Sequence, residues 1–428
     1  MRILVENSGY RLLNMGDLAM LTVALSRLDR LFPHSSIQVL TSDPEKLSEI
    51  FPSTKPISVQ ARMTWFSPLA ARYYQLPLIR YFSKLGLFLE NLLRRHKPTL
   101  FLRILSLKLK KKAGLLEEVR LLMDALYRAD IVIATGGGYI TDEFKCETQP
   151  RLAMLSLANQ LGIPTILVGQ GLGPVQDLEL QRQIKKTLAQ ADLICLREQL
   201  ASVALINYIG IPNVPILITG DDAIELAYKA RTEHIGSGIG INLRVAPYSE
   251  VGESIVQTLR LVFLNIASKF QASLIPIPID HSAYDGLVDP DSTTIEKLVG
   301  QDSRDLGGGA ELDTPLKIIE QVGRCRVVIT GSYHAGVFAL SQGIPVVGLA
   351  KSKYYVDKFF GLADQFGVGC SVLMLDEIDL ENKLTDCTKN LWNEAETLRP
   401  ILLDAARAQI QAGIIAYQKI LEEVKLKR

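Results

Sequence analysis

A short apolar run, a glycine-rich or polar turn, and a stretch of helical periodicity recur in that order along the chain. In the first half the apolar runs are 3–5, 37–40, 131–134, 165–168 and 193–196. They are near-continuous rather than alternating, which is typical of parallel strands buried on both faces and joined by helical crossovers. The pattern restarts with the runs 238–242, 273–277, 327–330 and 345–349. It predicts an α/β protein with two doubly wound sheets.

The polar stretch 229–238 separates the two sets of runs, and we place an interdomain linker there. A chain of 428 residues exceeds what one hydrophobic core usually organises. The predicted domains are 1–230 and 231–390, followed by a helix over 391–428 that packs back on the domain junction. Two such domains facing each other place the carboxyl ends of their strands around one cleft.

Composition excludes several classes of protein. The chain has 47 basic and 46 acidic residues, a net charge of +1, and 48% hydrophobic residues. Global disorder is excluded by the apolar content, and no basic excess points to nucleic acid. The five cysteines form no Cys-x-x-Cys pair, which argues against a disulfide scaffold or a structural zinc site. The first apolar run is too short for a signal peptide, so a cytoplasmic location is expected.

One segment departs from the overall charge balance. Residues 62–112 carry twelve basic residues and one acid, Glu90, interleaved with aromatic residues, so the remainder of the chain carries +1 − 11 = −10. We expect a helical basic insertion over about 62–127. Two interpretations stay open: peripheral contact with an anionic membrane through 62–112, or helices that cap the first domain and turn their basic side to water. No apolar run there approaches the roughly twenty residues of a spanning helix.

His334 is the histidine most suited to catalysis. It follows the apolar run 327–330 and a turn of small residues, and it precedes an apolar helical segment. We therefore expect its imidazole at a helix N-terminus beside the cleft, a suitable place for a proton donor or an anion ligand. Arg197 and Arg244 each follow a predicted strand directly, with planar donors suited to carboxylate or phosphate.

Glycine-rich turns and lysines add to this picture. The triplet Gly136–Gly138 lets a ligand approach the backbone, and the turn 169–174 is expected to present Gln170 and Gly171 to the cleft. Neither matches the dinucleotide fingerprint, and the chain has no P-loop motif. Lys351, Lys353 and Lys358 follow the final strand. Together these residues predict a cleft for a small polyanion, with no metal site.

Six motifs, taken in order, resemble the polysaccharide pyruvyl transferase family from about Met1 to Gly367. They are Asn14-x-Gly16-Asp17, Gly136–Gly138 with Asp142, Gly169–Pro174, Arg197 with Ser202, Gly220–Ala223, and His334 with Gly343 and Pro345. The resemblance implies a glycosyltransferase-B-like fold of two facing Rossmann-like domains. Members transfer the enolpyruvyl skeleton of phosphoenolpyruvate onto two hydroxyls of a sugar, which leaves a pyruvyl ketal and phosphate.

The resemblance also implies roles for residues of this chain. His334 and Arg197 become the catalytic pair that handles phosphoenolpyruvate, with no further cofactor. Many members have an arginine where this chain has Ser332, so Arg244 or Lys351 would supply that charge, and Lys353 would add an anion contact. Asp17, Asp142 or Asp221 would act as base or orient the acceptor. The expected substrate-binding residues are Asn14, Gly16, Asp17, Gly136, Gly137, Gly138, Asp142, Gln170, Gly171, Asp221, Arg244, Ser332, Lys351 and Lys353.

The leading hypothesis is thus a ketal-forming transferase of cell-surface polysaccharide synthesis, acting on a saccharide that is free or lipid-linked. Its location would be cytoplasmic, with peripheral contact at the inner face of the plasma membrane as an open addition. Two alternatives remain: a nucleotide-sugar-dependent glycosyltransferase on the same frame, and a non-catalytic membrane-surface component of a polysaccharide assembly system.

Overall fold

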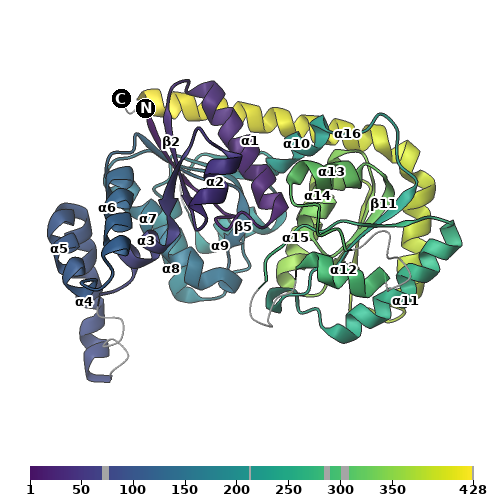
Figure 1. Ribbon diagram of the computed structural model, residues 1–428, viewed down its shortest axis with the longest axis horizontal. Coiled ribbons are helices and arrows are strands. Elements are labelled where there is room, and N and C mark those ends of the chain that lie inside the picture. The colour runs from purple at the N-terminus through teal and green to yellow at the C-terminus, as the bar shows by residue number, and fades with distance from the viewer. Residues whose placement is uncertain (70–76, 212–213, 284–289, 300–307, 427–428) are drawn as a thin grey trace.

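The computed structural model describes residues 1–69, 77–211, 214–283, 290–299 and 308–426. They form two parallel-sheet units placed side by side, the first on the left and the second on the right of Figure 1. The predicted α/β class is therefore confirmed. The segment 230–237 between the two sheets is described throughout and forms neither helix nor strand.

The first sheet has eight strands, ordered β3-β2-β1-β4-β6-β7-β8, with β5 paired to β6 off this path. All of its pairings are parallel. The strands are β1 (Arg2–Glu6), β2 (Ser36–Thr41), β3 (Lys55–Ser58), β4 (Ile131–Ala134), β5 (Gly137–Ile140), β6 (Thr165–Leu172), β7 (Leu193–Leu196) and β8 (Ile216–Ile218).

The second sheet has five strands, ordered β10-β9-β11-β12-β13 and again all parallel. These are β9 (Gly238–Asn242), β10 (Leu274–Pro276), β11 (Cys325–Thr330), β12 (Val346–Ala350) and β13 (Cys370–Met374). Each predicted apolar run lies on a strand. The sequence did not predict β3 and β5, which are polar or glycine-rich, or β8 and β13, which are mostly apolar but only partly buried.

Helices cover both faces of the sheets. Those of the first unit are α1 (Met15–Leu31), α2 (Pro44–Ile50), α3 (Val59–Phe66), α4 (Pro77–His96), α5 (Pro98–Lys108), α6 (Ala113–Tyr127), α7 (Lys145–Gln160), α8 (Leu178–Leu188), α9 (Leu200–Ile209) and α10 (Ala223–Lys229). Those that follow are α11 (Glu253–Phe270), α12 (Asp291–Val299), α13 (Pro315–Val322), α14 (Tyr333–Ser341), α15 (Lys353–Phe366) and α16 (Leu380–Leu426).

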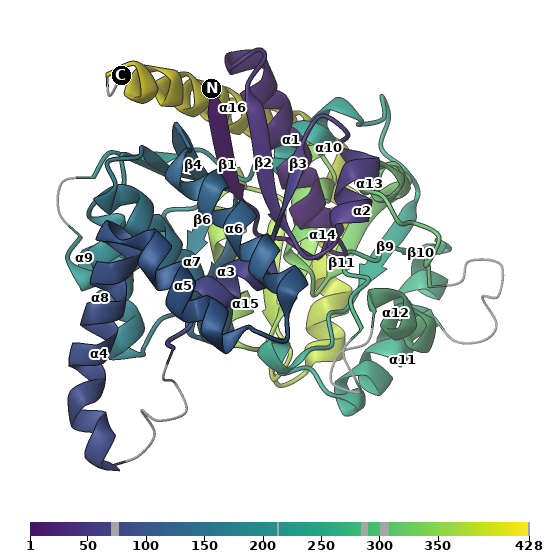
Figure 2. The ribbon, with the colours of Figure 1, turned by 60° about the vertical axis from the view of Figure 1, so that its left-hand side comes forward.

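The predicted basic insertion is helical: α3 to α6 occupy it, and α4 projects below the rest of the first unit in Figures 1 and 2. Residues 70–76 of the insertion lie outside the described part of the chain. Two of its basic residues do not face water, because the side chains of Arg62 and Arg94 are buried and pair with Glu6 and Glu90. Among the described helices, none combines the length and hydropathy needed to cross a bilayer.

The long helix α16 starts at Leu380, earlier than the expected 391, and runs along the top of both units in Figure 1. It contacts α14 and β11 of the second unit and α1 and α10 of the first. Its buried side chains include Leu402, Ala406, Tyr417 and Ile420. The helix therefore ties the two sheets together along one edge.

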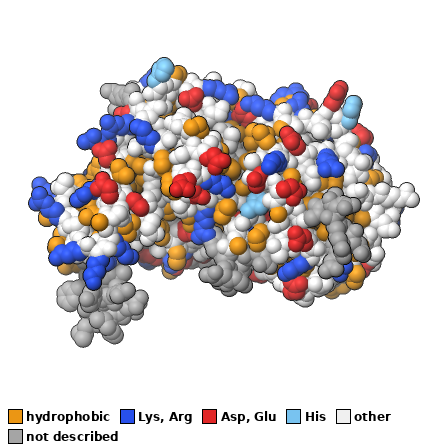
Figure 3. Space-filling view, in the orientation of Figure 1, with side chains coloured by type: hydrophobic (Ala, Val, Ile, Leu, Met, Phe, Trp, Pro, Cys, Tyr) orange, Lys and Arg blue, Asp and Glu red, His pale blue; other side chains and the backbone are white. Residues whose placement is uncertain are grey.

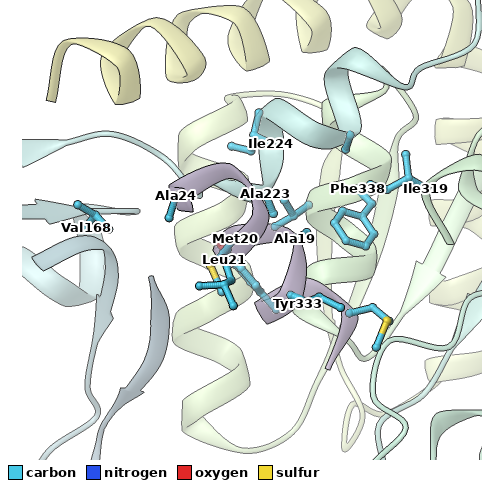
Figure 4. Packing of buried hydrophobic residues seen from close by; sticks show 14 of the residues in the cluster. Ala19, Met20, Leu21, Ala24, Val168, Ala223, Ile224, Ile319, Tyr333 and Phe338 are labelled. Atoms are coloured by element: carbon cyan, nitrogen blue, oxygen red, sulfur yellow. The ribbon is translucent and has the colours of Figure 1, made fainter. Parts of the chain in front are cut away.

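One buried cluster crosses the junction between the two units. Figure 4 shows Ala19 and Met20 of α1 next to Ala223 of α10, with Phe338 of α14 and Ile319 of α13 beside them. These residues come from both sheets' helices yet form one contiguous core. The two units are therefore joined at this junction by shared apolar packing.

A buried ionic group lies at the same junction. Arg27 of α1 pairs with Asp222 at 2.6 Å and with Glu225 of α10 at 2.7 Å. The hydroxyl of Tyr417 on α16 donates to the second oxygen of Asp222 at 3.1 Å. Since Arg27 is only 6% exposed, the buried Asp222 depends on it for charge compensation, while Glu225 is shared between Arg27 and Lys229.

Replacement of Arg27 by alanine should lower the free energy of unfolding by roughly 3–5 kcal/mol, because it leaves the buried Asp222 without its cation and Glu225 with Lys229 alone. Urea titration followed by circular dichroism measures the change. Arg30→Ala, which removes an exposed arginine from the same helix, is the matched control and should cost less than about 1 kcal/mol. Equal losses in the two variants would contradict the assigned role of Arg27.

Candidate active site

A cavity of about 320 Å³ lies between the two units, where the carboxyl ends of strands from both sheets meet. The loop after β1 (8–14) and the segment 137–139 line it from the first unit. The second unit contributes the segment 332–334 and α15 residues. A cleft between the units at the strand ends is what the sequence predicted.

His334 occupies the predicted position: α14 begins at Tyr333 with Ser332 as its N-cap residue, and both Ser332 and His334 line the cavity. The imidazole lies directly against the first turn of α1, because a Cβ atom at Gly16 would overlap the His334 ring. Gly16 therefore does not contact the cavity itself. Its missing side chain lets a helix of one unit close on His334 of the other.

The surroundings of His334 disfavour its charged form. Burial, with Arg197 and Lys358 as neighbouring cations, lowers the pKa of His334 well below its ordinary value of 6.5. Its Nε2 lies 3.7 Å from Asp221 Oδ2 and makes no hydrogen bond to any described protein group. In the ligand-free protein near neutral pH, His334 is consequently a neutral imidazole.

Arg197 lies directly after β7, as predicted, and lines the cavity while being only 2% exposed. Its guanidinium carbon stacks over the Tyr333 ring at 4.1 Å, and its Nη1 lies 3.5 Å from Asp221 Oδ2. Neither Nε nor Nη1 makes a hydrogen bond to a described protein group. Buried donors without such partners are costly in an empty site and valuable when an anion binds.

Two of the predicted glycines make room for this arginine. A Cβ at Gly171 would lie 2.6 Å from Arg197 Nε, and one at Gly138 would lie 2.9 Å from its Nη2 and 2.8 Å from Lys358 Cε. The triplet Gly136–Gly138 forms part of a short strand and its approach rather than a turn into a helix. Thus Gly137 and Gly138 line the cavity, and the missing side chains admit cations from the protein.

Of the three lysines that follow the last predicted strand, Lys358 is the one that lines the cavity. It lies on α15, lines the cavity, and donates from Nζ to the hydroxyl of Tyr354 at 2.5 Å. Tyr354 in turn donates to the carbonyl of Gly138 at 3.0 Å. Burial, with Arg197 as a nearby cation, lowers the pKa of Lys358 well below 10.5. The sequence could have pointed to Lys358, because Tyr354 and Lys358 are spaced i, i+4 and therefore share one helix face.

Lys351 and Lys353 do not reach the cavity. Lys351 is half buried outside it, and the ammonium of Lys353 is exposed and pairs with Asp357 at 2.9 Å. Arg244 does line the cavity, but Asp280 and Asp291 each pair with it at 2.9 Å. Lys351 and Lys353 were therefore wrongly expected at the cavity, Arg244 lines it with its charge paired, and Lys358 is the lysine that lines it.

Four further predicted residues stand behind the cavity. Gln170 is buried and donates to the carbonyls of Thr135 and Val168, because β6 continues through it and turns its side chain into the sheet. Asp142 accepts from the amides of Gln176 and Asp177. Asp221 accepts from the amide of Ala223 and lies under Arg197. Gly136 packs on Gly169 and Met20. These residues shape the site without lining it.

Asn14 and Asp17 open helix α1 at the cavity wall. Asn14 caps the helix through the amides of Gly16 and Asp17, and its own amide reaches Asp280 of the second unit at 3.3 Å. Burial, reinforced by Asp280 and Asp221 and opposed by Lys358, raises the pKa of Asp17 to about 7 from its ordinary 3.8. A carboxyl group that titrates near neutrality in the same cavity as His334 is suited to general acid–base chemistry.

Sequence reasoning missed Arg151, a fully buried cavity residue from the middle of α7. Its Nε lies 3.7 Å from Glu6 and its Nη2 donates to the carbonyl of Ser8 at 3.0 Å. It stacks over the Tyr139 ring at 4.2 Å.

Within the described part of the chain, no group of three or more His, Cys, Asp or Glu side chains is arranged to hold a metal ion.

The fold belongs to the two-domain class represented by nucleotide-sugar epimerases. A structure of UDP-GlcNAc 2-epimerase from Neisseria meningitidis bound to UDP-GlcNAc matches with a TM-score of 0.51 and 13% identity, covering 100% of both chains. The S. aureus MnaA–UDP structure matches with a TM-score of 0.53 and 13% identity, covering 99% of this chain and 96% of the other. At this identity the likeness shows the fold alone, and it confirms the expected glycosyltransferase-B-like arrangement.

The sequence comparison identifies the family within this fold class. The model of the polysaccharide pyruvyl transferase family matches residues 14–352, and the chain belongs to that family. The matched region begins at Asn14 and contains His334, Arg197 and both glycine-rich segments. A comparison with curated protein sequences gives no significant match.

Replacing Asp17 by asparagine tests its elevated pKa through stability. Between about pH 4 and 7 the folded wild type holds a proton that the unfolded chain has lost, so wild-type stability falls as the pH rises through this window. The Asn variant should therefore gain stability over wild type on going from pH 4 to 8, by on the order of 2–4 kcal/mol. Denaturant titrations at each pH measure the difference.

Asp29→Asn removes an exposed carboxyl from the same helix and is the matched control. The same pH-dependent gain in both variants would contradict the assignment to Asp17.

Proposed function

We propose that this protein transfers a pyruvyl group from phosphoenolpyruvate to two hydroxyls of a saccharide and forms a cyclic ketal during polysaccharide synthesis. The observation that carries the proposal is the meeting of Arg197, Lys358 and His334 in one cavity, where Nε and Nη1 of Arg197 make no hydrogen bond to a described protein group. Phosphoenolpyruvate offers the two anionic groups, phosphate and carboxylate, that such donors bind best. Family membership supports a saccharide acceptor.

The reaction places defined demands on the site. A proton adds to the methylene carbon of phosphoenolpyruvate, and positive charge develops at the adjacent carbon. One sugar hydroxyl attacks that carbon, the bond to the phosphate oxygen breaks, and the second hydroxyl forms the other ketal bond. Of the two hydroxyl protons released, one balances the proton now in the methyl group and the other leaves with phosphate. The site must therefore hold an anion, move protons and exclude water.

The residues of the cavity divide these tasks. Arg197 and Lys358 hold the anionic donor and stabilise the departing phosphate. The charge of the bound donor reverses the effect of these cations on His334, raises its pKa, and makes it the proton donor. Asp17, with a pKa of about 7, accepts a proton from an attacking hydroxyl. Asn14 fixes the position of Asp17 by capping α1.

His334→Ala should lower phosphoenolpyruvate-dependent ketal formation by about 10²–10⁴-fold, the usual contribution of general acid catalysis. Phosphate release from phosphoenolpyruvate in the presence of a panel of saccharide acceptors measures the rate, and mass spectrometry of the acceptor detects the ketal. Retained turnover in a folded His334→Ala protein would remove His334 from the mechanism.

Lys358→Gln should lower kcat/KM for phosphoenolpyruvate by about 10–100-fold, because it removes one charge-assisted contact to the donor. Lys353→Gln, which removes an exposed lysine of the same helix, is the control and should change kcat/KM less than about 2-fold. Ser332→Arg in the Lys358→Gln background should recover part of the loss. Equal effects of the two lysine variants would contradict the selection of Lys358.

Thermal shifts with ligands separate the alternatives. Stabilisation by phosphoenolpyruvate, with none by UDP or GDP sugars, supports the pyruvyl transferase. Stabilisation by a UDP or GDP sugar, with none by phosphoenolpyruvate, would favour a nucleotide-sugar glycosyltransferase. A purified protein that releases phosphate with no acceptor in the panel and binds no donor would favour a non-catalytic component of polysaccharide assembly.

A further inference from the structure

The helices α4 and α5 carry an unusual share of exposed apolar side chains. Of the twenty-one large hydrophobic residues that are exposed in the described part of the chain, seven lie on these two helices. On α4 they are Leu85, Phe88, Leu89 and Leu92, and on α5 they are Leu100, Ile104 and Leu107. Phe88 is 61% exposed and Leu107 is 65% exposed. Such a concentration on a folded protein marks an interaction surface.

Their spacing makes each helix amphipathic. The α4 residues recur at i, i+3, i+4 and i+7, and the α5 residues at i, i+4 and i+7, so each set forms a single stripe. The opposite faces anchor the helices to the first unit. Glu90 and Arg94 are buried as an ion pair, and Phe101 packs edge-on against Trp65 with ring centroids 4.9 Å apart. The exposed stripes are therefore held outward by a fixed support.

The exposed charged residues of the stretch 85–116 have one sign. Arg95 continues the α4 stripe three residues beyond Leu92, and Arg103 lies between Leu100 and Leu107 on α5. Further exposed cations follow at Lys97, Lys108 and Lys110–Lys112. From 85 to 116 the sequence contains one acid, Glu90, and it is buried. Figure 3 shows Lys and Arg side chains interspersed with hydrophobic ones at the left end of the molecule, where these helices lie.

We propose that the α4–α5 surface, defined by these seven apolar residues and the exposed cations Arg95, Lys97, Arg103, Lys108 and Lys110–Lys112, docks on an anionic lipid bilayer. Apolar stripes bordered by arginine and lysine bury their side chains at the level of the acyl chains while the cations contact lipid headgroups. The contact is peripheral, since no described helix has the character of a membrane span.

Two other occupants fit the same surface less well. A second copy joined by two-fold symmetry would bring the same cations of both chains against each other, which is unfavourable without intervening acids. Nucleic acid would leave the apolar stripes without a partner, because phosphate contacts depend on a charged groove rather than on leucine. An anionic bilayer alone offers both an apolar phase and negative charge within a few ångströms.

Flotation of the purified full chain with vesicles tests the proposal without any substrate, so its outcome is independent of the proposed enzymatic function. Wild type should float with vesicles of phosphatidylcholine containing 30% phosphatidylglycerol, and binding should weaken in high salt. Vesicles of phosphatidylcholine alone should bind at least about 10-fold less. Lys110→Gln, Lys111→Gln and Lys112→Gln should each weaken binding to anionic vesicles by about 5-fold.

Leu107→Glu should abolish flotation, whereas Leu261→Glu is the matched control. Leu261 is also 65% exposed but lies on α11 in the second unit. Unfolding curves confirm that both variants fold. Absence of wild-type flotation, equal binding to neutral vesicles, or an equal effect of the two Leu→Glu variants would overturn the proposal. So would a wild-type dimer that Leu107→Glu converts to a monomer without any vesicle binding, since the surface would then join two copies.

Discussion

The contact between Gly16 and the His334 ring determines how the rest of the molecule is arranged. It brings the first turn of α1, from one sheet, against the first turn of α14, from the other. Backbone hydrogen bonds fix the same junction: the amide of Met15 donates to Ile279 at 2.8 Å, and the amide of His281 donates to Leu13 at 3.0 Å. The cavity, the shared core and the capping Asn14 all lie within this junction. A displacement of the two units here would move His334 away from Asp17.

The cations of the cavity are not equivalent. Arg244 is compensated by two carboxylates, and Arg151 lies beside the carboxylate of Glu6. Arg197 makes a longer contact with Asp221, and Lys358 is held by a neutral tyrosine hydroxyl. Among the buried cations that line the cavity, Arg197 and Lys358 are therefore less closely paired with carboxylates than Arg244. Because both cations also lower the pKa of His334, binding of an anion and protonation of the histidine favour each other.

The sequence predicted those parts of the molecule that depend on local pattern. Buried parallel strands are continuous in sequence, and a side chain directly after such a strand must lie at the carboxyl edge, so Arg197 and His334 could be placed without coordinates. Gln170 was misplaced because β6 extends further than its apolar run, which turned a supposed loop residue into one that points into the sheet. Strand length at a glycine-rich end carries no clear local signal.

Arg151 and Lys358 depend on tertiary packing instead. Each lies within a helix, and only the position of that helix against the opposite unit decides that the side chain reaches the cavity. Helical periodicity nevertheless separates Lys358 from Lys353, since Lys353 pairs with Asp357 one turn later, whereas Lys358 pairs with Tyr354 one turn earlier. The two lysines thus lie on different faces of α15. A motif comparison that treats the lysines as one cluster cannot make this distinction.

The basic insertion and the cavity are connected through one buried carboxylate. Glu6, at the end of β1, pairs with Arg62 of α3, the helix that leads into α4, and also lies beside Arg151 at the cavity wall. Because an uncompensated charge is costly at this depth, the three side chains must keep their relative positions. Arg94 of α4 in turn donates to the carbonyl of Trp65 on α3 at 2.9 Å, so the α4–α5 surface is joined to the cavity wall through packed side chains. The bilayer contact that we propose would hold the cavity at a fixed orientation, which would suit the lipid-linked form of the proposed acceptor.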